Sequence, residues 1–289
     1  MTYKERIRQI NPNLVINSLR SNDEGLVNDV VIVNEDTVFR FAKNDYGVRV
    51  LANELRVMDL IRNKVNLALP EPIYRSADAI AYPFLNGITL SREKVFALGE
   101  ADRQAVADQL GSFLRTLHTL PLTDTLRTEI TPTPAPCRYA DWIAIRRQVE
   151  EHVWPLLMAH QKVWVQNLFD SVLNDTGAFD YTPVLIHGDL GPYHLLFDGT
   201  TRRLTGVIDF GVAGTGDSAV DIGILLNVYG ETFVSLMLGV YPEIEVLLPR
   251  ARFYAQTVEL QWVLSGIKTG ETFWFTAHLG NARDIRVGL

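Results

Sequence analysis

The sequence predicts an α+β protein of two lobes, with a small β-rich lobe at the N-terminus and a larger, mostly helical lobe after it. Apolar, β-branched runs separated by polar turns fill the first third of the chain. Apolar residues at helical spacing dominate the remainder. At 289 residues the chain is long enough for both lobes to bury a core. We expect residues 1–82 to form the first lobe, residues 83–87 to form a hinge, and residues 88–289 to form the second lobe.

The first lobe combines short strands with one helix. Leu51, Leu55 and Met58 recur at helical spacing and predict a helix over residues 48–62. Polar turns separate the apolar runs before this helix, and a further extended segment follows it and ends at Asn86-Gly87. The expected extended segments are residues 14–19, 27–33, 37–41 and 80–84.

The second lobe is expected to be mainly helical. Apolar residues from Val106 to Leu117 form one helical face that stops at Pro121, and prolines then mark residues 121–136 as a loop. Further helices are expected near residues 141–160, 163–173, 221–238 and 250–267, with short strands at residues 184–187, 194–197 and 204–208.

Composition excludes several classes of protein. A net charge of -7 and a pI near 5.4 argue against a nucleic-acid partner. No uninterrupted apolar run approaches the roughly 20 residues of a membrane-spanning helix, and the N-terminus is polar and mixed in charge, unlike a secretory signal. The single cysteine, Cys137, rules out an intramolecular disulfide. We expect a cytoplasmic protein that acts on neither nucleic acid nor membrane.

The most informative stretch is H-G-D-L-G-P-Y-H at residues 187–194, followed by I-D-F-G at residues 208–211. Each carboxylate follows a short apolar strand, so both are expected on loops at strand ends. Phosphoryl transfer needs one aspartate to orient a hydroxyl and accept its proton, and a second to hold the metal on the phosphates. Either tripeptide alone is a common turn, but together they predict Asp189 as the catalytic base and Asp209 as a ligand of Mg²⁺.

Two histidines flank the first aspartate. His194 stands five residues after Asp189, where a protein kinase has Asn. A neutral imidazole can coordinate a divalent metal, although Mg²⁺ prefers oxygen, so His194 is a candidate metal ligand with a structural role as the alternative. His187 is expected to brace the loop through hydrogen bonds. His118, at the end of a predicted helix, is expected at the surface or at a helix cap.

The small lobe supplies candidates for binding a nucleotide. Val38 and Arg40 lie on the same face of a strand, so Val38 can touch the base while Arg40 reaches the phosphates. Glu54 on the following helix can hold that cation by an ion pair. Lysine is usual at this position, and Lys43 is the alternative cation, while a solvated charge pair is the simpler explanation for Arg40 and Glu54. Gly25 would let a turn approach the phosphates.

Together these residues resemble the aminoglycoside phosphotransferase family, antibiotic kinases that share the protein-kinase-like fold. The H-G-D…H-L-L-F-D…G-V-I-D-F-G block carries the most specific part of the resemblance. F-R-F-A-K at residues 39–43 with Asn53-Glu54 is similar to the family's phosphate-binding strand and helix. The resemblance implies a hinge containing Phe84 and Leu85, preceded by Tyr82 as gatekeeper. It also implies a chiefly structural acidic pair, which is Asp217 and Asp221 here.

The resemblance implies a kinase that transfers the γ-phosphate of ATP or GTP, as its Mg²⁺ complex, to a hydroxyl of an antibiotic. His194 replaces the family's commoner Asn, a feature shared with the aminoglycoside 2″-phosphotransferases and the macrolide phosphotransferases. Some members of these branches prefer GTP. Bulky Tyr82 could narrow the base pocket, so ATP and GTP both remain open.

The acceptor is less well defined by the sequence. Aminoglycosides carry several positive charges and need acidic pockets, which modestly favours them, whereas an apolar aromatic wall would suit a macrolide or leave these aromatics in the core. The candidate acceptor-binding residues are Glu231, Glu259, Trp262, Glu271 and Trp274. Alternatives are a kinase of another metabolite hydroxyl and a nucleotide-binding module without transfer activity. A protein kinase is disfavoured because no Ala-Pro-Glu arrangement follows Asp209.

Overall fold

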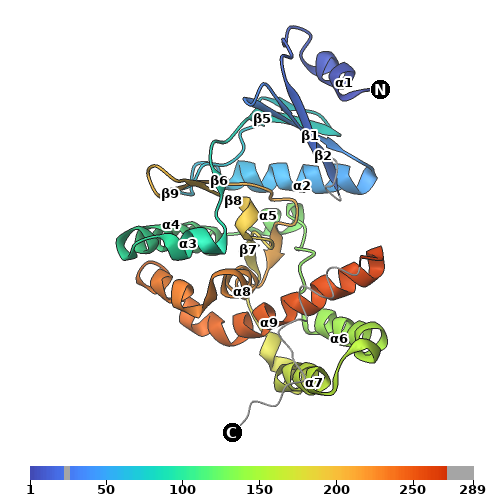
Figure 1. Cartoon of the computed structure of the whole chain (residues 1–289), viewed down its shortest axis with the longest axis vertical. Helices are drawn as coiled ribbons and strands as arrows, with labels where there is room; N and C mark the ends of the chain where they lie inside the picture. Colours follow the sequence, from blue (N-terminus) through green and yellow to red (C-terminus); the bar gives the residue numbers. More distant parts are fainter. Residues whose placement is uncertain (23–26, 272–289) are drawn as a thin grey trace.

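The computed structural model describes residues 1–22 and 27–271 and has two lobes stacked along its long axis (Figure 1). A β-sheet with two helices forms the smaller lobe, and helices form most of the larger one. The α+β, two-lobed prediction is therefore confirmed.

The small lobe is built on an antiparallel five-stranded sheet with the order β1-β2-β3-β5-β4. In the register, Arg40 lies opposite Val30 on one side and Ile80 on the other, which places Arg40 at the centre of the sheet. The strands are β1 (Leu19–Asn22), β2 (Asn28–Val33), β3 (Thr37–Ala42), β4 (Tyr74–Arg75) and β5 (Ala79–Pro83).

A helix packs on each face of this sheet. Phe39 and Phe41 of β3 share a buried cluster with Ile7 of α1 (Tyr3–Ile10). Val38, on the opposite face, shares another cluster with Leu51 of α2 (Asp45–Ile61). Side chains alternate along a strand, so Arg40 points to the α2 face. Since α2 lies between the sheet and the large lobe (Figure 1), Arg40 is directed toward the junction of the lobes.

The large lobe surrounds one extensive apolar core. The end of α2 contributes to this core, which joins the two lobes. Residues 84–87 connect β5 to the large lobe. The helices are α3 (Arg92–Ala97), α4 (Glu100–His118), α5 (Asp124–Glu129), α6 (Tyr139–Gln148), α7 (Ala159–Leu173), α8 (Ala219–Leu236) and α9 (Ile244–Thr269), with shorter turns η1 (Val149–Val153), η2 (Trp154–Leu156), η3 (Thr176–Phe179), η4 (Pro192–His194) and η5 (Met237–Gly239).

Short strands carry the two motif loops. The first loop follows β7 (Val184–Ile186), which pairs with β10 (Gly214–Gly216). The second follows β9 (Arg203–Val207), which pairs with β8 (Leu195–Asp198) and through it with β6 (Ile88–Thr89). The Ile208 N–H donates to the His194 carbonyl oxygen at 3.0 Å, which ties the two loops together.

One segment of the described chain, residues 219–239, is long and apolar enough to cross a membrane by length and composition. This segment contains α8, whose residues Ile222, Leu225 and Phe233 are buried in the large core. It packs against α9 as a core helix of the lobe.

Three predicted elements differ from the structure. The strand expected at residues 14–19 is wrong, because β1 begins only at Leu19. The loop expected at 121–136 contains α5, which the Thr123 side chain caps by accepting from the Leu126 N–H. The single helix expected at 141–160 is broken at η1 and η2, where Pro155 supplies no N–H donor.

Candidate active site

The backbone of the first motif loop is held by a buried carboxylate from α8. Asp221 accepts hydrogen bonds from the N–H groups of His187 at 2.9 Å and Gly188 at 2.8 Å. Its Oδ2 also lies 3.0 Å from Nε2 of His118. Burial alone would raise the pKa of Asp221, but hydrogen bonding to His118 and the backbone lowers it, so the carboxylate stays ionised.

The prediction that His118 is a surface or cap residue is wrong. Its side chain is buried, and Nδ1 lies 2.8 Å from the hydroxyl of Tyr241. His118 therefore links α4 to Asp221 and, through it, to the motif loop. Asp217 is structural as well, because its carboxylate pairs with Arg250 at 2.7 Å and accepts from the Tyr254 hydroxyl at 2.9 Å.

The loop turns sharply at Gly188, whose φ is +79°. A Cβ there would stand 2.9 Å from Thr133 Oγ1 and 3.0 Å from the Val212 carbonyl oxygen. Both the left-handed backbone and the close approach therefore require glycine directly before Asp189.

His187 braces the two loops as a neutral imidazole. Its Nε2 lies 3.2 Å from the Ile208 carbonyl oxygen and so carries the proton, while Nδ1 accepts from the Asp189 N–H at 3.3 Å. Complete burial lowers the pKa of His187 to about 4. These contacts confirm the expected bracing role.

Asp189 keeps 56% of its side chain exposed at the mouth of the loop. Partial burial raises the pKa of this carboxyl, nearby Asp209 acts in the same direction, and His194 opposes them. A raised pKa is the direction that makes a carboxylate a better proton acceptor.

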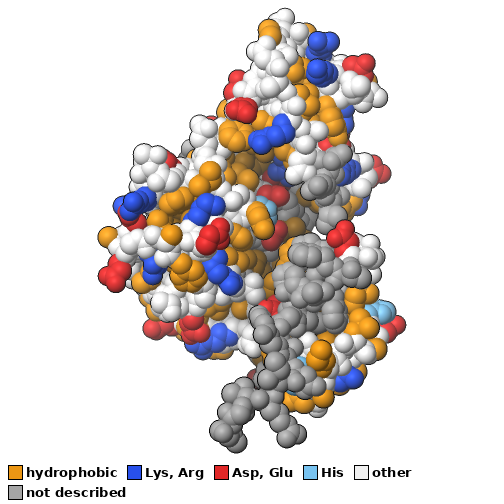
Figure 2. All heavy atoms as spheres, viewed as in Figure 1, with side chains coloured by type: hydrophobic (Ala, Val, Ile, Leu, Met, Phe, Trp, Pro, Cys, Tyr) orange, Lys and Arg blue, Asp and Glu red, His pale blue; other side chains and the backbone are white. Residues whose placement is uncertain are grey.

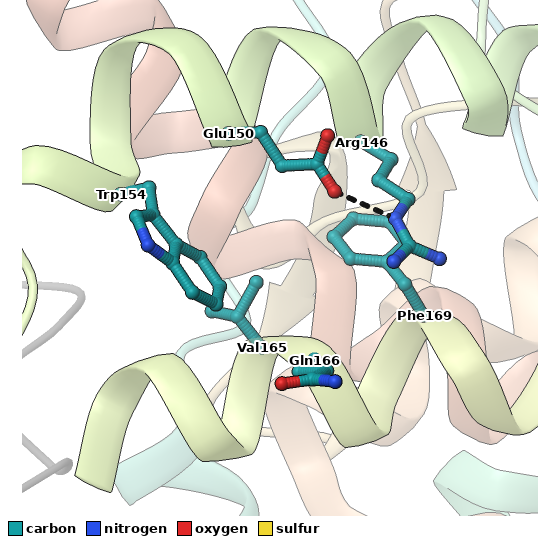
Figure 3. A pocket seen from close by; sticks show the side chains of 6 residues that line it. All are labelled: Arg146, Glu150, Trp154, Val165, Gln166 and Phe169. Atoms are coloured by element: carbon teal, nitrogen blue, oxygen red, sulfur yellow. Dashed lines mark hydrogen bonds and ion pairs between the residues drawn. The ribbon is translucent and has the colours of Figure 1, made fainter. Parts of the chain in front are cut away.

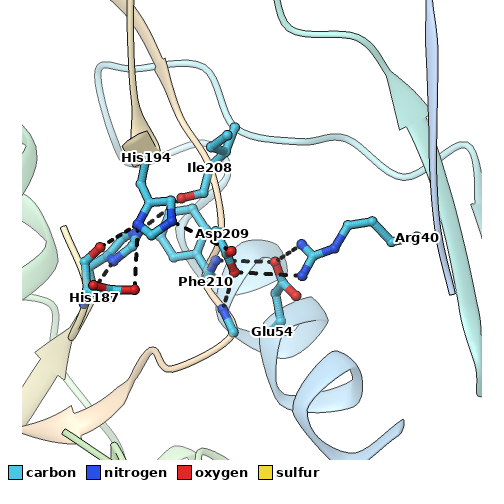
Figure 4. Close-up of polar contacts among 9 residues, drawn as sticks. Arg40, Glu54, His187, His194, Ile208, Asp209 and Phe210 are labelled. Atoms are coloured by element: carbon cyan, nitrogen blue, oxygen red, sulfur yellow. Dashed lines mark hydrogen bonds and ion pairs between the residues drawn. The ribbon is translucent and has the colours of Figure 1, made fainter. Parts of the chain in front are cut away.

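His194 and Asp209 lie side by side (Figure 4). His194 Nδ1 is 2.6 Å from the Asp189 carbonyl oxygen, which can only accept, so Nδ1 carries the proton. In the neutral ring the lone pair is then on Nε2, which lies 3.7 Å from Asp209 Oδ2. No group of three or more histidine, cysteine or acidic side chains suited to a metal occurs in the described part of the chain. Any ion here must therefore take its remaining ligands from elsewhere.

Asp209 adopts a left-handed backbone, with φ +63°, that an aspartate rarely takes. Burial alone would raise its pKa, but Arg40 first of all, and then His194 and His187, hold the pKa of Asp209 below its usual value. The conformation is fixed by its neighbour, because the Phe210 N–H donates to Glu54 Oε1 at 3.2 Å.

Arg40 and Glu54 form a buried ion pair, with 2.6 Å between Nη1 and Oε1 (Figure 4). Arg40 Nη2 also lies 3.7 Å from Asp209 Oδ1. Burial disfavours the charge on Arg40, but Glu54 and Asp209 raise its pKa, so it remains a cation. Lys43 instead approaches Asp29, at 3.5 Å. The geometry therefore places Arg40, rather than Lys43, beside the two motif aspartates.

A cavity of about 340 Å³ lies under the sheet and contains Arg40, Tyr82, Asp189 and Asp209 in its wall. Val38 is packed in the apolar cluster beside this cavity. The Phe84 N–H donates to the Asp36 carbonyl oxygen at 2.7 Å. The remaining lining residues are Val27, Asn28, Val30, Tyr46, Val50, Ile208, Gly211 and Val212. Neither Val38, Phe84 nor Leu85 is in this wall, and Gly25 lies outside the described residues.

A second cavity, of about 690 Å³, lies on the other side of Asp189. Its wall is mainly apolar and includes Trp262 and the exposed ring of Tyr193. The other lining residues are Ala135, Pro136, Trp142, Gly188, Gly191, Pro192, His194, Val220, Ile224, Asn227, Val228, Tyr254, Val258, Gln261 and Ser265. In Figure 2, acidic and histidine side chains meet in the recess between the lobes.

Among the predicted acceptor-binding residues that the structure describes, only Trp262 is in that wall. Glu231 pairs with Arg252 at the surface, Glu259 is half-buried with a pKa raised by burial, and Glu271 is exposed after α9. Trp274 lies outside the described residues. Asp189 is the only acidic residue among the described residues that line the second cavity.

A further cavity of about 380 Å³ lies between the α6–η1 segment and α7 (Figure 3). The pair Arg146–Glu150 and the rings of Trp154 and Phe169 line it. None of its described lining residues lines either of the other two cavities, so it is separate from the candidate site.

Comparisons with known proteins show the family of the chain. The model of the phosphotransferase enzyme family matches residues 18–254. An aminoglycoside 3′-phosphotransferase of Streptomyces fradiae is 33% identical over 128 residues, which is 43% of this chain and 45% of that protein. The aligned part thus spans less than half the length of this relative.

Solved structures extend the similarity over the whole chain. A GDP and kanamycin complex of APH(2″) has 26% identity and a TM-score of 0.86, covering 97% of this chain and 96% of that one. A macrolide 2′-phosphotransferase type I has 21% identity and a TM-score of 0.73, covering 99% of each chain, and shows the fold alone. The family resemblance of the sequence motifs is confirmed, and the chain belongs to the phosphotransferase enzyme family.

Proposed function

We propose that this protein transfers the γ-phosphate of a purine nucleoside triphosphate to a hydroxyl of an aminoglycoside-type antibiotic. One observation carries the proposal: Asp189 lies in the walls of both cavities. The 340 Å³ cavity holds the cation and the metal-ligand candidate, and the 690 Å³ cavity has room for an acceptor. A carboxylate at their junction can meet a hydroxyl from one side and a phosphate from the other.

The proposed step needs few protein groups. The acceptor hydroxyl hydrogen-bonds to the Asp189 carboxylate, and its proton passes to that carboxylate as the new O–P bond forms. The bond from the γ-phosphorus to the bridging oxygen breaks, and the nucleoside diphosphate leaves. Arg40, steadied by Glu54, faces the phosphates and offsets their charge.

The donor set also suits Mg²⁺. His194 Nε2 and Asp209 Oδ2 are 3.7 Å apart and both lack a hydrogen in the forms derived above, so both can face one ion. Mg²⁺ usually takes few protein ligands and completes its shell with phosphates and water. When bound, it would supply positive charge to the phosphate oxygens. We propose His194 and Asp209 as its protein ligands.

The base is proposed to lie near residues 83–87, the proposed hinge. The Leu85 N–H has no hydrogen-bond partner among the described residues and is available to a purine edge. Two solved APH(2″) and aminoglycoside 2′-phosphotransferase relatives with 26% and 27% identity contain GDP, which supports GTP as the first nucleotide to test. Tyr82 is buried beside this region, and burial raises the pKa of its hydroxyl to about 12, so it stays a neutral donor. We propose the cytoplasm as the setting, where such nucleotides are available.

The mainly apolar second cavity favours a macrolide as a second candidate acceptor. Polycationic ligands need carboxylates close by, and Asp189 alone supplies one among the described lining residues. A large apolar ligand with a single amine would meet Trp262, Tyr193 and the aliphatic wall more favourably.

The test is a phosphotransfer screen of purified protein against kanamycin, gentamicin and erythromycin, each with MgATP and with MgGTP. Nucleoside diphosphate release and phosphorylated product are measured together, with Asp189→Asn and a reaction without acceptor as controls. Product formed by the wild type and lost in Asp189→Asn supports the enzyme. Nucleotide binding with no product from any hydroxyl acceptor would support a binding module instead. Turnover of erythromycin alone would make the macrolide the acceptor class.

A further inference from the structure

The roof of the 340 Å³ cavity holds an asparagine that the motifs do not explain. Asn28 is the first residue of β2 and is only 5% exposed. Its amide oxygen is buried and has no hydrogen-bond partner among the described residues, yet Asn28 lines the cavity. A buried polar group without a partner destabilises the folded protein by about 1–3 kcal/mol. A role in binding a ligand would account for a polar side chain at this buried position.

The register shows which way Asn28 points. Asn28 and Val30 lie on the same face of β2, and Val30 is directly opposite Arg40 of β3. The amide therefore shares the cavity-facing side of the sheet with the Arg40 guanidinium, one pleat closer to the start of β2. Arg40 Nε is likewise buried and has no partner in the part of the chain that the structure describes. Beside the Arg40–Glu54 ion pair, the roof of the cavity thus holds one guanidinium nitrogen and one amide oxygen that have no partner among the described protein atoms.

The two sides of the cavity differ in charge. Asp189 and Asp209 contribute carboxylates from the motif loops, whereas Arg40 is the cation in the described wall. An anion with several oxygens would lie between them, against the roof. Because the oxygen of Asn28 is enclosed, the NH₂ end is the end left to meet a ligand, and it can only donate.

We propose that Asn28 binds the phosphate chain of the nucleotide, with its NH₂ group donating to a phosphate oxygen beside Arg40. This inference rests on the proposed nucleotide-dependent function of the cavity. The Asn28 amide would add a neutral hydrogen-bond donor beside the positive charge of Arg40. The contact explains why an amide lines this cavity, and the amide oxygen stays enclosed behind the donating NH₂ group.

The test measures nucleotide binding to the full chain in the presence of Mg²⁺. Asn28→Leu removes the donor at similar size, and Asn28→Asp replaces it by a charge that repels phosphate. The ligands are a non-hydrolysable GTP analogue, its ATP counterpart, and the free nucleosides. Asn66→Leu is the matched control, since Asn66 is exposed and donates to the Gln109 carbonyl oxygen outside the cavity.

We expect Asn28→Leu to weaken triphosphate binding roughly tenfold and Asn28→Asp to weaken it further. Nucleoside binding should stay within about twofold, and the KM of the acceptor should not change. Equal losses for nucleoside and triphosphate, or unchanged triphosphate binding in Asn28→Leu, would overturn the phosphate contact. Failure of the wild type to bind either triphosphate would overturn the proposed function itself, and with it this inference. Circular dichroism of each variant separates these results from unfolding.

Discussion

Removing the charge of Glu54 should cost far more stability than removing the charge of an exposed glutamate in the same kind of pair. Glu54 is completely buried and holds both Arg40 Nη1 at 2.6 Å and the Phe210 N–H at 3.2 Å. Glu54→Gln keeps the size of the side chain but leaves a buried guanidinium without its main counter-charge. Breaking a buried pair from one side typically costs about 3–5 kcal/mol. Asp209, whose Oδ1 lies 3.7 Å from Arg40 Nη2, would still offset part of the positive charge of Arg40 in this variant. We therefore expect the lower end, a loss of about 3 kcal/mol in the free energy of unfolding.

The chain contains a matched control. Glu243 pairs with Arg115 at 2.8 Å, but both side chains are 46% exposed. Glu243→Gln should cost less than about 1 kcal/mol, because solvent screens an exposed pair. Urea unfolding followed by circular dichroism and tryptophan fluorescence compares the two variants directly. A Glu54→Gln loss no larger than that of Glu243→Gln would refute the account of this ion pair as a buried link between α2, β3 and the second motif loop.

Three further outcomes follow from the same contacts. Burial lowers the pKa of His187 in the folded protein from the ordinary 6.5 to about 4, so the unfolded chain binds the proton first as the pH falls. The free energy of unfolding should then fall by about 3 kcal/mol as the pH falls from 6.5 to 4. Urea unfolding at several pH values measures this, and the same dependence of stability on pH in His187→Gln as in the wild type would contradict it. The raised pKa of Asp189 predicts that kcat/KM falls with decreasing pH at a midpoint above 3.8, and a midpoint at or below that value would count against Asp189 as the base. Gly188→Ala should lower the free energy of unfolding by about 1–3 kcal/mol and abolish most activity, because its Cβ enters occupied space at a positive φ. Gly191→Ala is the control, since there is open space around Gly191, and it should keep the wild-type stability and activity. If Gly188→Ala and Gly191→Ala changed the melting temperature and the turnover equally, the claim that the turn at Gly188 requires glycine would be contradicted.

The positions of the motif residues were predictable because they depend on short stretches of chain. Asp189, His194 and Asp209 lie on two loops, each fixed by one strand and a few following residues. The pairing of Arg40 with Glu54 was also predictable, since both the strand alternation and the following helix are local patterns. The choice between Arg40 and Lys43 was not, because it depends on where β3 ends and on the position of Asp29 beside it.

The residues that line the 690 Å³ cavity were the hardest to predict, because they depend on packing between helices that are distant in the sequence. Which face of α8 or α9 meets the cavity follows from how these helices cross, and that crossing directs Glu231 toward Arg252 instead. His118 was mistaken for a surface residue for the same reason, since Asp221 and Tyr241 are more than 100 positions away. In contrast, α1 had a local signal in the capping box of Thr2 and Glu5, which the prediction overlooked.

The most direct test of the central claim is the rate of phosphate transfer by Asp189→Asn compared with the wild type, at saturating Mg²⁺-nucleotide and with an accepted antibiotic. Asparagine keeps the size and position of the side chain but accepts no proton. We predict that nucleotide affinity stays within about threefold while kcat falls by roughly 10²–10⁴, the usual contribution of a general base. A variant that binds nucleotide and transfers phosphate at the wild-type rate would contradict the assignment of Asp189 as the group that joins the two cavities in one reaction.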